Sequence, residues 1–302
     1  MAARLWQRLA FSRFPNSPKC TIRAMATAST DKNLVEVEKV GSVLLIGINR
    51  PENRNAINPA TAKVLYSAFK EFENDSDCHV AVLHGKGGNF CAGYDLKELS
   101  RVNADDENMQ EIGEPIDHEL GFMGPSRMAF SKPVIAAVSG YAVAGGLELA
   151  LMCDLRVVEE NAIMGVFCRR FGVPLLDGGT VRLPQLIGLS RALDLILTGR
   201  PVGAKEALEM GLANRVVSTG TALGSAILLA NSLVKFPQEC MNADRRSAYY
   251  SCYEAKSVQD ALQHEYIDGV KVLTKESIPG AKTFADGIGR HGSFNLNVKS
   301  NL

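Results

Sequence analysis

The sequence predicts an α/β fold, in which helices cover a largely parallel sheet and a helical region follows it. Two observations support this prediction. From about residue 33 to residue 217, short apolar runs typical of buried strands alternate with segments whose apolar residues recur at helical spacing. After Val217 only helical spacing remains. A strand, a crossover helix and a second strand in succession favour parallel pairing, because parallel neighbours need a long connection that is usually a helix.

The core elements are expected in the following order. A first strand over residues 43–48 (VLLIGI) ends at the turn Asn49-Arg50-Pro51, and a helix over 59–74 follows, with apolar residues every three or four positions. Further strands are expected at 80–83, 134–138 and 155–158, with a short helix at 147–152. The apolar character of these strand runs indicates burial on both faces of the sheet.

The C-terminal third is expected to be helical, with helices over about 219–235, 237–254 and 257–273. In the last of these helices, one face is formed by Val258, Leu262, Tyr266, Gly269 and Leu273. A helical third beside an α/β core indicates an appendage or an assembly module. Residues 101–115 are acidic and polar, and they predict an exposed, mobile loop or the start of a helix.

Composition excludes several classes of protein. The 302 residues are 46% hydrophobic and 22% charged, which is ordinary for a globular protein and excludes wholesale disorder. No stretch approaches 18 uninterrupted apolar residues, so no membrane-spanning helix is expected. Basic and acidic residues number 33 each, and this balance gives no sign of a nucleic-acid partner. The seven cysteines and five histidines share no metal-ligand spacing, so no metal is expected.

Residues 1–30 differ from the rest of the chain in charge. They contain five basic residues and no acidic one, with many Ser, Thr and Ala. Without them the chain has 28 basic and 33 acidic residues, a net charge of −5. This composition is typical of a mitochondrial transit peptide and predicts a protein of the mitochondrial matrix. Two alternatives stay open: a disordered basic tail, and a peroxisomal address at the C-terminal Ser300-Asn301-Leu302, which differs from Ser-Lys-Leu at its middle position.

Two glycine-containing turns follow strands, one at residues 89–96 and one at 140–148. If Gly145 and Gly146 open a helix, their N–H groups have no partner within the helix and point outward. A second strand-end amide aimed at the same point would complete a two-donor oxyanion hole. The alternative is two tight turns whose glycines are structural. Neither phosphate-loop nor dinucleotide-binding spacing occurs, which argues against ATP and NAD.

Glu148 is a carboxylate within the strongly apolar run 147–152. Burial would raise its pKa toward neutrality, which suits a general acid or base. Two alternatives stay open. The carboxylate lies at the one wet edge of the helix, or it pairs with Arg156 or Arg170.

Three segments together resemble the enoyl-CoA hydratase/isomerase (crotonase) superfamily, namely residues 90–99 (FCAGYDLKEL), 140–155 and 165–198. The runs 201–207 (PVGAKEA) and 211–217 (GLANRVV) extend the match to about residues 35–290, in the right order and spacing. The resemblance is strongest to the bacterial enoyl-CoA hydratase branch. It implies a crotonase-like spiral of ββα units over residues 33–217. It also implies a C-terminal helical region over 218–302 that forms homotrimers, usually paired into hexamers.

The resemblance also implies a substrate and a binding mode. Substrates are acyl-CoA thioesters, so CoA belongs to the substrate and no separate cofactor is implied. The backbone N–H groups of Tyr94 and Gly145 would form the oxyanion hole, in agreement with the two turns. Lys97 matches a position that contacts the CoA nucleotide. Further implied contacts are Ala92, Asp95 and Leu96 along the pantetheine, and Arg54, Asn55 and Ala56 on the adenine side.

One catalytic position departs from the hydratase pattern. Glu148 matches the first catalytic glutamate of the hydratases, which activates the water. The second glutamate, the proton donor at the α-carbon, is missing, because the alignment places Cys168 there. A buried thiol is a poor substitute for a carboxylic acid. Asp177, in a glycine-rich turn near the implied acyl pocket, is the candidate replacement, and the alternative is that it caps a helix beginning at Thr180.

Three functions stay open on this sequence. The first is hydration of 2-enoyl-CoA to 3-hydroxyacyl-CoA in fatty acid or branched acyl catabolism, with Glu148 and Asp177 as the catalytic pair. The second is a different reaction through the same enolate, namely isomerisation, decarboxylation or thioester hydrolysis, and the missing second glutamate is the reason to consider it. The third is a protein that binds acyl-CoA without turnover. Of the three, we expect hydration.

Overall fold

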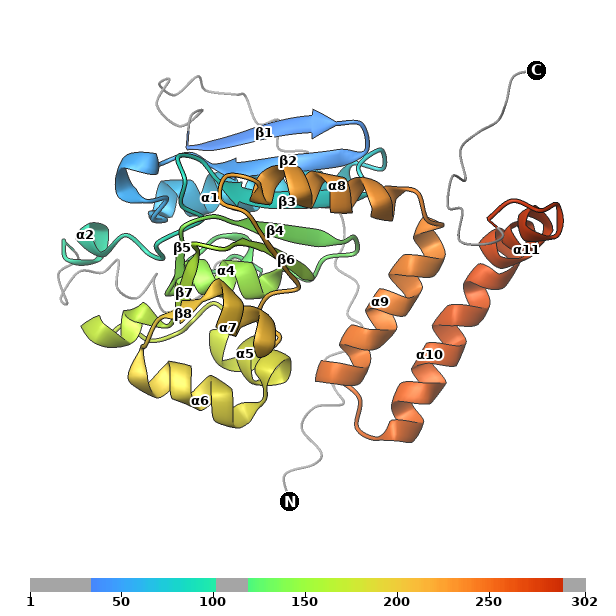
Figure 1. Ribbon diagram of the computed structural model, residues 1–302. Coiled ribbons are helices and arrows are strands. Elements are labelled where there is room, and N and C mark those ends of the chain that lie inside the picture. Colours follow the sequence, from blue (N-terminus) through green and yellow to red (C-terminus); the bar gives the residue numbers. More distant parts are fainter. Residues whose placement is uncertain (1–33, 102–118, 290–302) are drawn as a thin grey trace, which may run out of the picture. The chain divides into compact units, whose positions relative to one another are not determined.

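The computed structural model describes residues 34–101 and 119–289. The expected transit segment, residues 102–115 of the acidic stretch and the C-terminal tripeptide lie outside these residues. The described residues form an α/β fold with a helical C-terminal part, as the sequence predicts (Figure 1).

The larger sheet has six strands in the order β1-β2-β3-β4-β6-β9. Their bounds are β1 Val35–Val40, β2 Val43–Ile48, β3 Val80–Gly85, β4 Val134–Val138, β6 Leu155–Glu159 and β9 Arg215–Val217. Neighbouring strands pair in parallel, except that β1 and β2 are antiparallel. The prediction of a largely parallel sheet is therefore confirmed. The sequence does not predict β1, because this edge strand has five exposed residues and lacks a buried run.

A second, three-stranded sheet joins β5 (Tyr141–Val143), β7 (Ile163–Gly165) and β8 (Val202–Gly203). Strand β5 pairs with β7 in parallel, and β7 pairs with β8 antiparallel. Strands of two or three residues show too little periodicity to be predicted from sequence. This sheet positions the glycine turns, because β5 leads directly into the turn at Ala144 and is bridged to Cys91 of the other turn.

The helices of the core begin with α1 (Pro59–Asn74), where predicted, and the Asn58 side chain caps α1 by accepting from the N–H of Thr61. The other core helices are α2 (Leu96–Leu99), α4 (Gly145–Met152), α5 (Gly179–Ile187), α6 (Leu189–Thr198), α7 (Ala204–Glu209) and α8 (Ala222–Val234). The C-terminal helices are α9 (Gln238–Tyr253), α10 (Val258–Val272) and α11 (Ile278–Ala285), with the π-helical turn η5 (Leu273–Ser277) before α11. Short 3₁₀ turns are η2 (Pro51–Asn53), η3 (Pro125–Arg127) and η4 (Phe167–Phe171).

One helix covers each face of the larger sheet. On one face, Leu44 and Ile46 of β2 share a core cluster with Phe69 of α1. On the other face, Val43 shares a second cluster with Leu229 of α8. Alternate residues of a strand point to opposite faces, so all six residues of β2 are buried. This double coverage explains the continuous apolar runs in the sequence.

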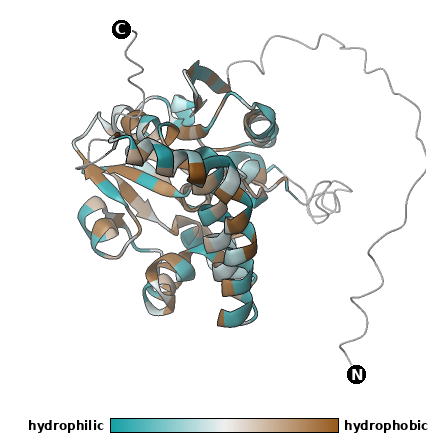
Figure 2. Ribbon diagram, turned by 90° about the vertical axis from the view of Figure 1, so that its right-hand side faces the viewer, coloured by the Kyte–Doolittle hydropathy of each residue, from teal (hydrophilic) through white to brown (hydrophobic). Residues whose placement is uncertain are grey.

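Helices α9 and α10 lie side by side (Figure 1), and α9 is anchored to the core. The Arg245 Nε and the Tyr249 hydroxyl each donate to Oδ1 of Asp154 at 2.8 Å. Oδ2 of Asp154 accepts from the N–H of Val134 in β4 at 2.7 Å, so one carboxylate links α9 to the sheet. Figure 2 shows that the C-terminal helices carry hydrophobic residues among hydrophilic ones. Among the described residues, no helix has the length and apolarity needed to span a membrane.

Candidate active site

The two glycine turns predicted from the sequence adjoin each other in the structure. The N–H of Cys91 donates to the carbonyl of Tyr141 at 2.9 Å, and the N–H of Val143 donates to the carbonyl of Cys91 at 3.1 Å. Gly93 has a φ of +97°, and a Cβ added there would lie 3.1 Å from the Gly145 nitrogen. Glycine is therefore required at Gly93 both by its backbone conformation and by the close approach of the second turn.

Among the backbone bonds of residues 34–101 and 119–289 at this meeting point, none is donated by the N–H of Tyr94 or Gly145. The two residues that flank Tyr94 bond to Ile57. The N–H of Ile57 donates to the carbonyl of Gly93, and the N–H of Asp95 donates to the carbonyl of Ile57. Gly145 is the first residue of α4, so its N–H has no partner within the helix. Ala144 before it has a φ of 53° and a ψ of −126°, a strained conformation for a residue with a side chain. Two free donors in adjoining turns suit an oxyanion.

Glu148 lies one turn into α4 and is only 3% exposed. Its Oε1 accepts from the N–H groups of Asp177 at 2.9 Å and Gly179 at 2.8 Å. Burial, followed by the charge of Asp177, raises the pKa of Glu148 to about 7, although the two N–H donors oppose this shift. A group with this pKa can accept or donate a proton at neutral pH.

The structure rejects the alternative interpretations of Glu148. The carboxylate is not at a wet edge, because α4 is buried along its whole length. Arg156 instead donates to the backbone carbonyls of Leu212 and Cys153, and Arg170 donates to the carbonyl of Gly199.

Asp177 lies in the loop before α5 and is also 3% exposed. Its Oδ1 accepts from the N–H of Met123 at 3.0 Å and from the Ser126 hydroxyl. Burial raises the pKa of Asp177, while these two donors oppose the rise. The helix-cap alternative is wrong, because the N-cap of α5 is Gly178 and no side chain caps this helix. Asp177 precedes the cap, and its carboxylate turns toward the segment around η3 instead.

Glu148 and Asp177 therefore form a pair of buried carboxylates joined through the N–H of Asp177. In each, one oxygen is held by two donors, and the other has no bond to the part of the chain that the structure describes. Since each charge disfavours the other, we expect the pair to hold one proton between them near neutral pH. Such a pair can act as base and acid on one bound molecule.

Cys168, which the family resemblance aligns with the second hydratase glutamate, is close enough to the pair to be affected by the charge of Glu148. It is buried, and burial followed by the charge of Glu148 raises the pKa of its thiol. The thiol is therefore neutral at physiological pH and transfers protons poorly. The structure thus brings Asp177 next to Glu148, where the N–H of Asp177 donates to the Glu148 carboxylate.

The segments expected to bind CoA are neighbours, because the N–H of Ala92 donates to the carbonyl of Arg54 at 3.0 Å. Arg54, Leu96 and Lys97 have exposed side chains that are available to a ligand. Of the residues expected to contact CoA, Asn55, Ala56 and Asp95 are buried. The Asn55 amide is used within the protein, where it donates to the carbonyls of Lys86 and Asn89. The backbone groups of Asp95 are used as well, because its N–H donates to the carbonyl of Ile57 and its carbonyl accepts from the N–H of Glu98.

Asp95 holds the Tyr94 turn in place through an ion pair with Arg50 at 3.0 Å, in which both side chains are buried. We expect Asp95→Ala to lower the free energy of unfolding by about 3–5 kcal/mol, because it leaves the Arg50 charge buried and unpaired. Urea denaturation followed by circular dichroism measures this loss. Glu98→Ala, which removes only the exposed pair with Arg101, is the matched control and should cost about 0.5 kcal/mol or less. Equal losses in the two variants would contradict the structural role of Asp95.

Sequence analysis missed two residues that contact this site, Ser126 and Arg182. The Ser126 hydroxyl bonds Asp177, and the Arg182 guanidinium donates to the backbone carbonyls of both Asp177 and Ser126. Ser126 is 51 residues from Asp177 in the sequence and belongs to no predicted strand or helix. No local signal points to it.

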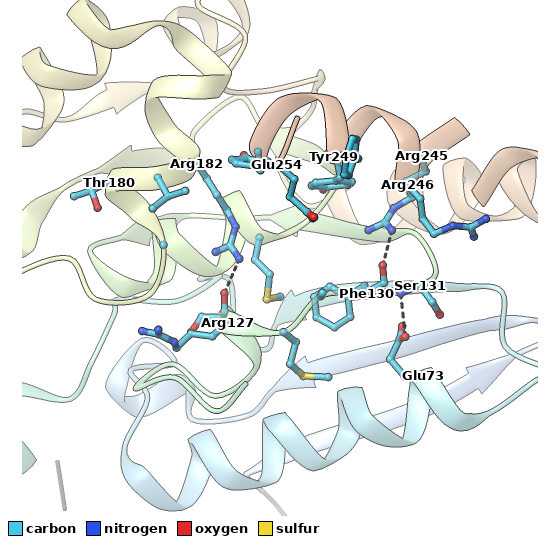
Figure 3. Close-up of a pocket in the computed structure, with 18 of the residues that line it drawn as sticks. Glu73, Arg127, Phe130, Ser131, Thr180, Arg182, Arg245, Arg246, Tyr249 and Glu254 are labelled. Carbon is cyan, nitrogen blue, oxygen red and sulfur yellow. Dashed lines mark hydrogen bonds between the residues drawn. The ribbon is translucent and has the colours of Figure 1, made fainter. Parts of the chain in front are cut away.

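A cavity of about 1000 Å³ lies next to the pair, between the core and helices α9 and α10. Figure 3 shows Tyr249 of α9 on one side of it and Phe130 on the other. Ser126 and Gly178, the neighbours of the Asp177 carboxylate, form part of its wall. In residues 34–101 and 119–289, no group of His, Cys, Asp or Glu is placed to hold a metal ion.

Comparison with known proteins agrees with this architecture. Residues 38–268 match the enoyl-CoA hydratase/isomerase family. The chain is 34% identical to enoyl-CoA hydratase EchA19 of Mycobacterium tuberculosis over 270 residues, which cover 87% of this chain and 97% of that protein. It is 34% identical to a probable mitochondrial enoyl-CoA hydratase of Dictyostelium discoideum over 228 residues, covering 76% and 79%.

A solved structure matches as well. It is that of an enoyl-CoA hydratase from Mycobacterium tuberculosis H37Rv, with a TM-score of 0.75 and 35% identity over 84% of this chain and 96% of that one. Family, length and fold agree, and the predicted crotonase-like architecture is confirmed. The chain belongs to the enoyl-CoA hydratase/isomerase family.

Proposed function

We propose that this protein adds water to 2-enoyl-CoA thioesters to form 3-hydroxyacyl-CoA. The observation that carries the proposal is the buried pair of Glu148 and Asp177 beside the free amides of Tyr94 and Gly145. Relatives whose names describe enoyl-CoA hydratases support the same reaction.

In the proposed mechanism the thioester oxygen accepts from the N–H groups of Tyr94 and Gly145. These donors stabilise the negative charge that develops on that oxygen as an enolate forms, and so make C3 electrophilic. Ionised Glu148 takes a proton from water, whose oxygen bonds to C3. The pair reacts in the form that carries its shared proton on Asp177, which delivers this proton to C2. Glu148 ends protonated and Asp177 ionised, and proton exchange with solvent restores the starting pair.

The CoA part is proposed to lie along the two adjoining turns. The exposed cations Lys97 and Arg54 are suited to the nucleotide phosphates, since both carry exposed positive charge beside these turns. The turn residues Ala92, Asp95 and Leu96 are assigned to the pantetheine, and Asn55 and Ala56 to the adenine side.

The test is the ultraviolet absorbance of crotonyl-CoA mixed with protein starting at residue 31. Loss of the conjugated enoyl thioester band, with 3-hydroxybutyryl-CoA as product, is the expected result. Absence of turnover while CoA esters still bind would overturn hydration. In that case Cys168 at the second glutamate position favours isomerisation, decarboxylation or thioester hydrolysis, and product identity across a panel of acyl-CoA esters distinguishes these reactions.

We further propose that the protein assembles as a homotrimer, or as a hexamer of two such trimers, through its C-terminal helices. The apolar face predicted for α10 points outward in the single chain, where Val258 is 75% and Tyr266 69% exposed. Exposed apolar patches of this kind mark protein interfaces. The double variant Leu262→Glu/Tyr266→Glu should lower the mass measured by light scattering from a trimer to a monomer. Gln263→Glu, on the same helix, is the control, and an unchanged mass in the double variant would contradict this interface.

The proposed location is the mitochondrial matrix. It is supported by the basic, acid-free residues 1–30 and by the Dictyostelium relative named as mitochondrial. Fluorescence microscopy of the full chain fused at its C-terminus, and of the chain without residues 1–30, tests it. Loss of mitochondrial signal on truncation is expected. Peroxisomal signal from a chain with a free C-terminus would favour the tripeptide address instead.

A further inference from the structure

We propose that Ser126 and Arg182 are positioning residues that hold the Asp177 carboxylate in its orientation and stabilise the anion that remains after Asp177 gives its proton to C2, an inference that rests on the proposed hydration. Neither residue is needed to touch the substrate. Together they determine where the second proton-transfer group points and when it carries a proton.

The Ser126 hydroxyl is the side-chain donor that reaches Asp177. Ser126 is 0% exposed, and its Oγ donates to the same Oδ1 that accepts from the N–H of Met123. Two donors on one oxygen leave Oδ2 as the oxygen free for chemistry. A buried donor to a carboxylate favours the ionised form, so this bond stabilises charged Asp177.

Arg182 connects the two segments that carry this bond. Its Nη1 donates to the carbonyl of Asp177 at 3.0 Å, and its Nη2 donates to the carbonyl of Ser126 at 2.7 Å. One planar guanidinium therefore holds the loop before α5 against η3, as Figure 3 shows for its bond to the segment beside Arg127. Both acceptors are backbone carbonyls, so these two bonds do not neutralise the Arg182 charge. That charge lowers the pKa of both Glu148 and Asp177.

Close packing of Gly121 and Gly124 restricts the orientation of the Asp177 carboxylate. Gly121 and Gly124 exchange reciprocal backbone hydrogen bonds at 2.8 and 2.9 Å beside it. A side chain at Gly121 would collide with both the Ser126 hydroxyl and the Asp177 carboxylate. Gly121, Gly124 and Ser126 therefore pack closely around the Asp177 carboxylate. Removing the Ser126 hydroxyl would give this carboxylate room to rotate.

The charges that face Asp177 come from three elements. Arg127 on η3 and Arg182 on α5 favour its ionised form, and the charge of Asp177 in turn raises the pKa of Glu148 on α4. Without the Ser126 hydroxyl, burial acts on Asp177 with less opposition. Asp177 would then take up its proton at a higher pH than in the wild type.

Ser126→Ala tests this inference with two independent readouts. With crotonyl-CoA, we expect kcat to fall about ten- to hundredfold and KM to stay within about twofold, because positioning rather than binding is lost. Isotope-edited infrared spectroscopy of ¹³C-aspartate protein, with Asp177→Asn to assign the band, should show the pKa of Asp177 rising by about one pH unit. Ser247→Ala, which removes a buried hydroxyl on α9, is the control and should change neither readout.

Unchanged titration and unchanged kcat in Ser126→Ala would overturn the inference, and so would a raised KM with the wild-type kcat. If Ser126→Ala does not fold, Ser126→Cys keeps the shape with a weaker donor and should show a smaller shift in the same direction. The infrared titration needs no turnover. A wild type that does not hydrate crotonyl-CoA would therefore refute the proposed function, while the titration would still decide the role of Ser126.

Discussion

Replacing Glu148 by glutamine is expected to lower kcat for hydration about a thousandfold, because removing a general base costs about a hundred- to ten-thousandfold. The amide oxygen of glutamine can still accept from the N–H groups of Asp177 and Gly179, so the turn before α5 keeps its bonds. The amide takes no proton from water at any physiological pH. Stopped-flow or steady-state loss of the crotonyl-CoA band measures the change, and calorimetry checks that CoA esters still bind.

The Glu148→Gln variant should lose activity but gain stability at high pH, so its stability gives a second test. The pKa of Glu148 is raised in the folded protein to about 7, so its contribution to stability is present below its ordinary pKa and is lost as the pH rises through about 7. At about pH 8.5 the wild type holds a buried charge that Glu148→Gln lacks. The variant should therefore be more stable there, by roughly 3 kcal/mol at most, and the advantage should shrink toward about pH 5.

Glu159→Gln is the matched control for Glu148→Gln, because Glu159 is buried but lies at the end of β6. It should leave kcat unchanged. Wild-type turnover in Glu148→Gln would exclude this carboxylate as the base, whatever its effect on stability. In the wild type, the acid limb of kcat/KM should fall near pH 7 and disappear with Glu148.

Asp177→Asn is the second large effect, with an expected loss of kcat of about a hundred- to a thousandfold. Asparagine keeps an oxygen for the Met123 N–H and the Ser126 hydroxyl, so the loop stays in place. It has no proton to deliver to C2. Solvent deuterium incorporation at C2 during the reverse reaction isolates this step, and it should fall in parallel with kcat.

Cys168 offers a rescue of that variant. The family resemblance aligns Cys168 with the second glutamate of the hydratases, so Cys168→Glu in the Asp177→Asn background is designed to restore a carboxylate near Glu148. We expect turnover to recover by at least about tenfold over Asp177→Asn alone. Asp177→Asn with unchanged turnover would show that hydration proceeds with one carboxylate, and the pair would lose its assigned roles.

The regular elements could be predicted where the local pattern is strong. Strands β2 and β4 and helix α1 have the bounds expected from the sequence, because both strands are buried on two faces and Asn58 with Pro59 marks the start of the helix. Helix α4 begins at Gly145, two residues before the expected start at Leu147, so the glycine pair does open the helix. Strand β1 and the three-stranded sheet show no such pattern and could not be predicted.

The residues of the candidate site could also be predicted only in part from the sequence. A carboxylate in an apolar run and glycines after strands pointed to Glu148 and Gly145, and the family resemblance pointed to Tyr94 and Asp177. The sequence left open whether Asp177 is a helix cap or a partner of Glu148. The structure decides this through the Met123 N–H and the Ser126 hydroxyl, which come from a segment more than 50 residues away.

The sequence by itself determined the fold class, the parallel core strands, the helical C-terminal region and the residue types available for acid–base chemistry. Only the tertiary structure decided which carboxylates lose contact with water, which donors hold them and which cations act on them. The reason is physical. Periodicity and turn chemistry depend on neighbours in the chain, whereas desolvation and hydrogen bonding depend on neighbours in space. Ser126 and Arg182 acquire their roles only when η3, α4 and α5 pack together.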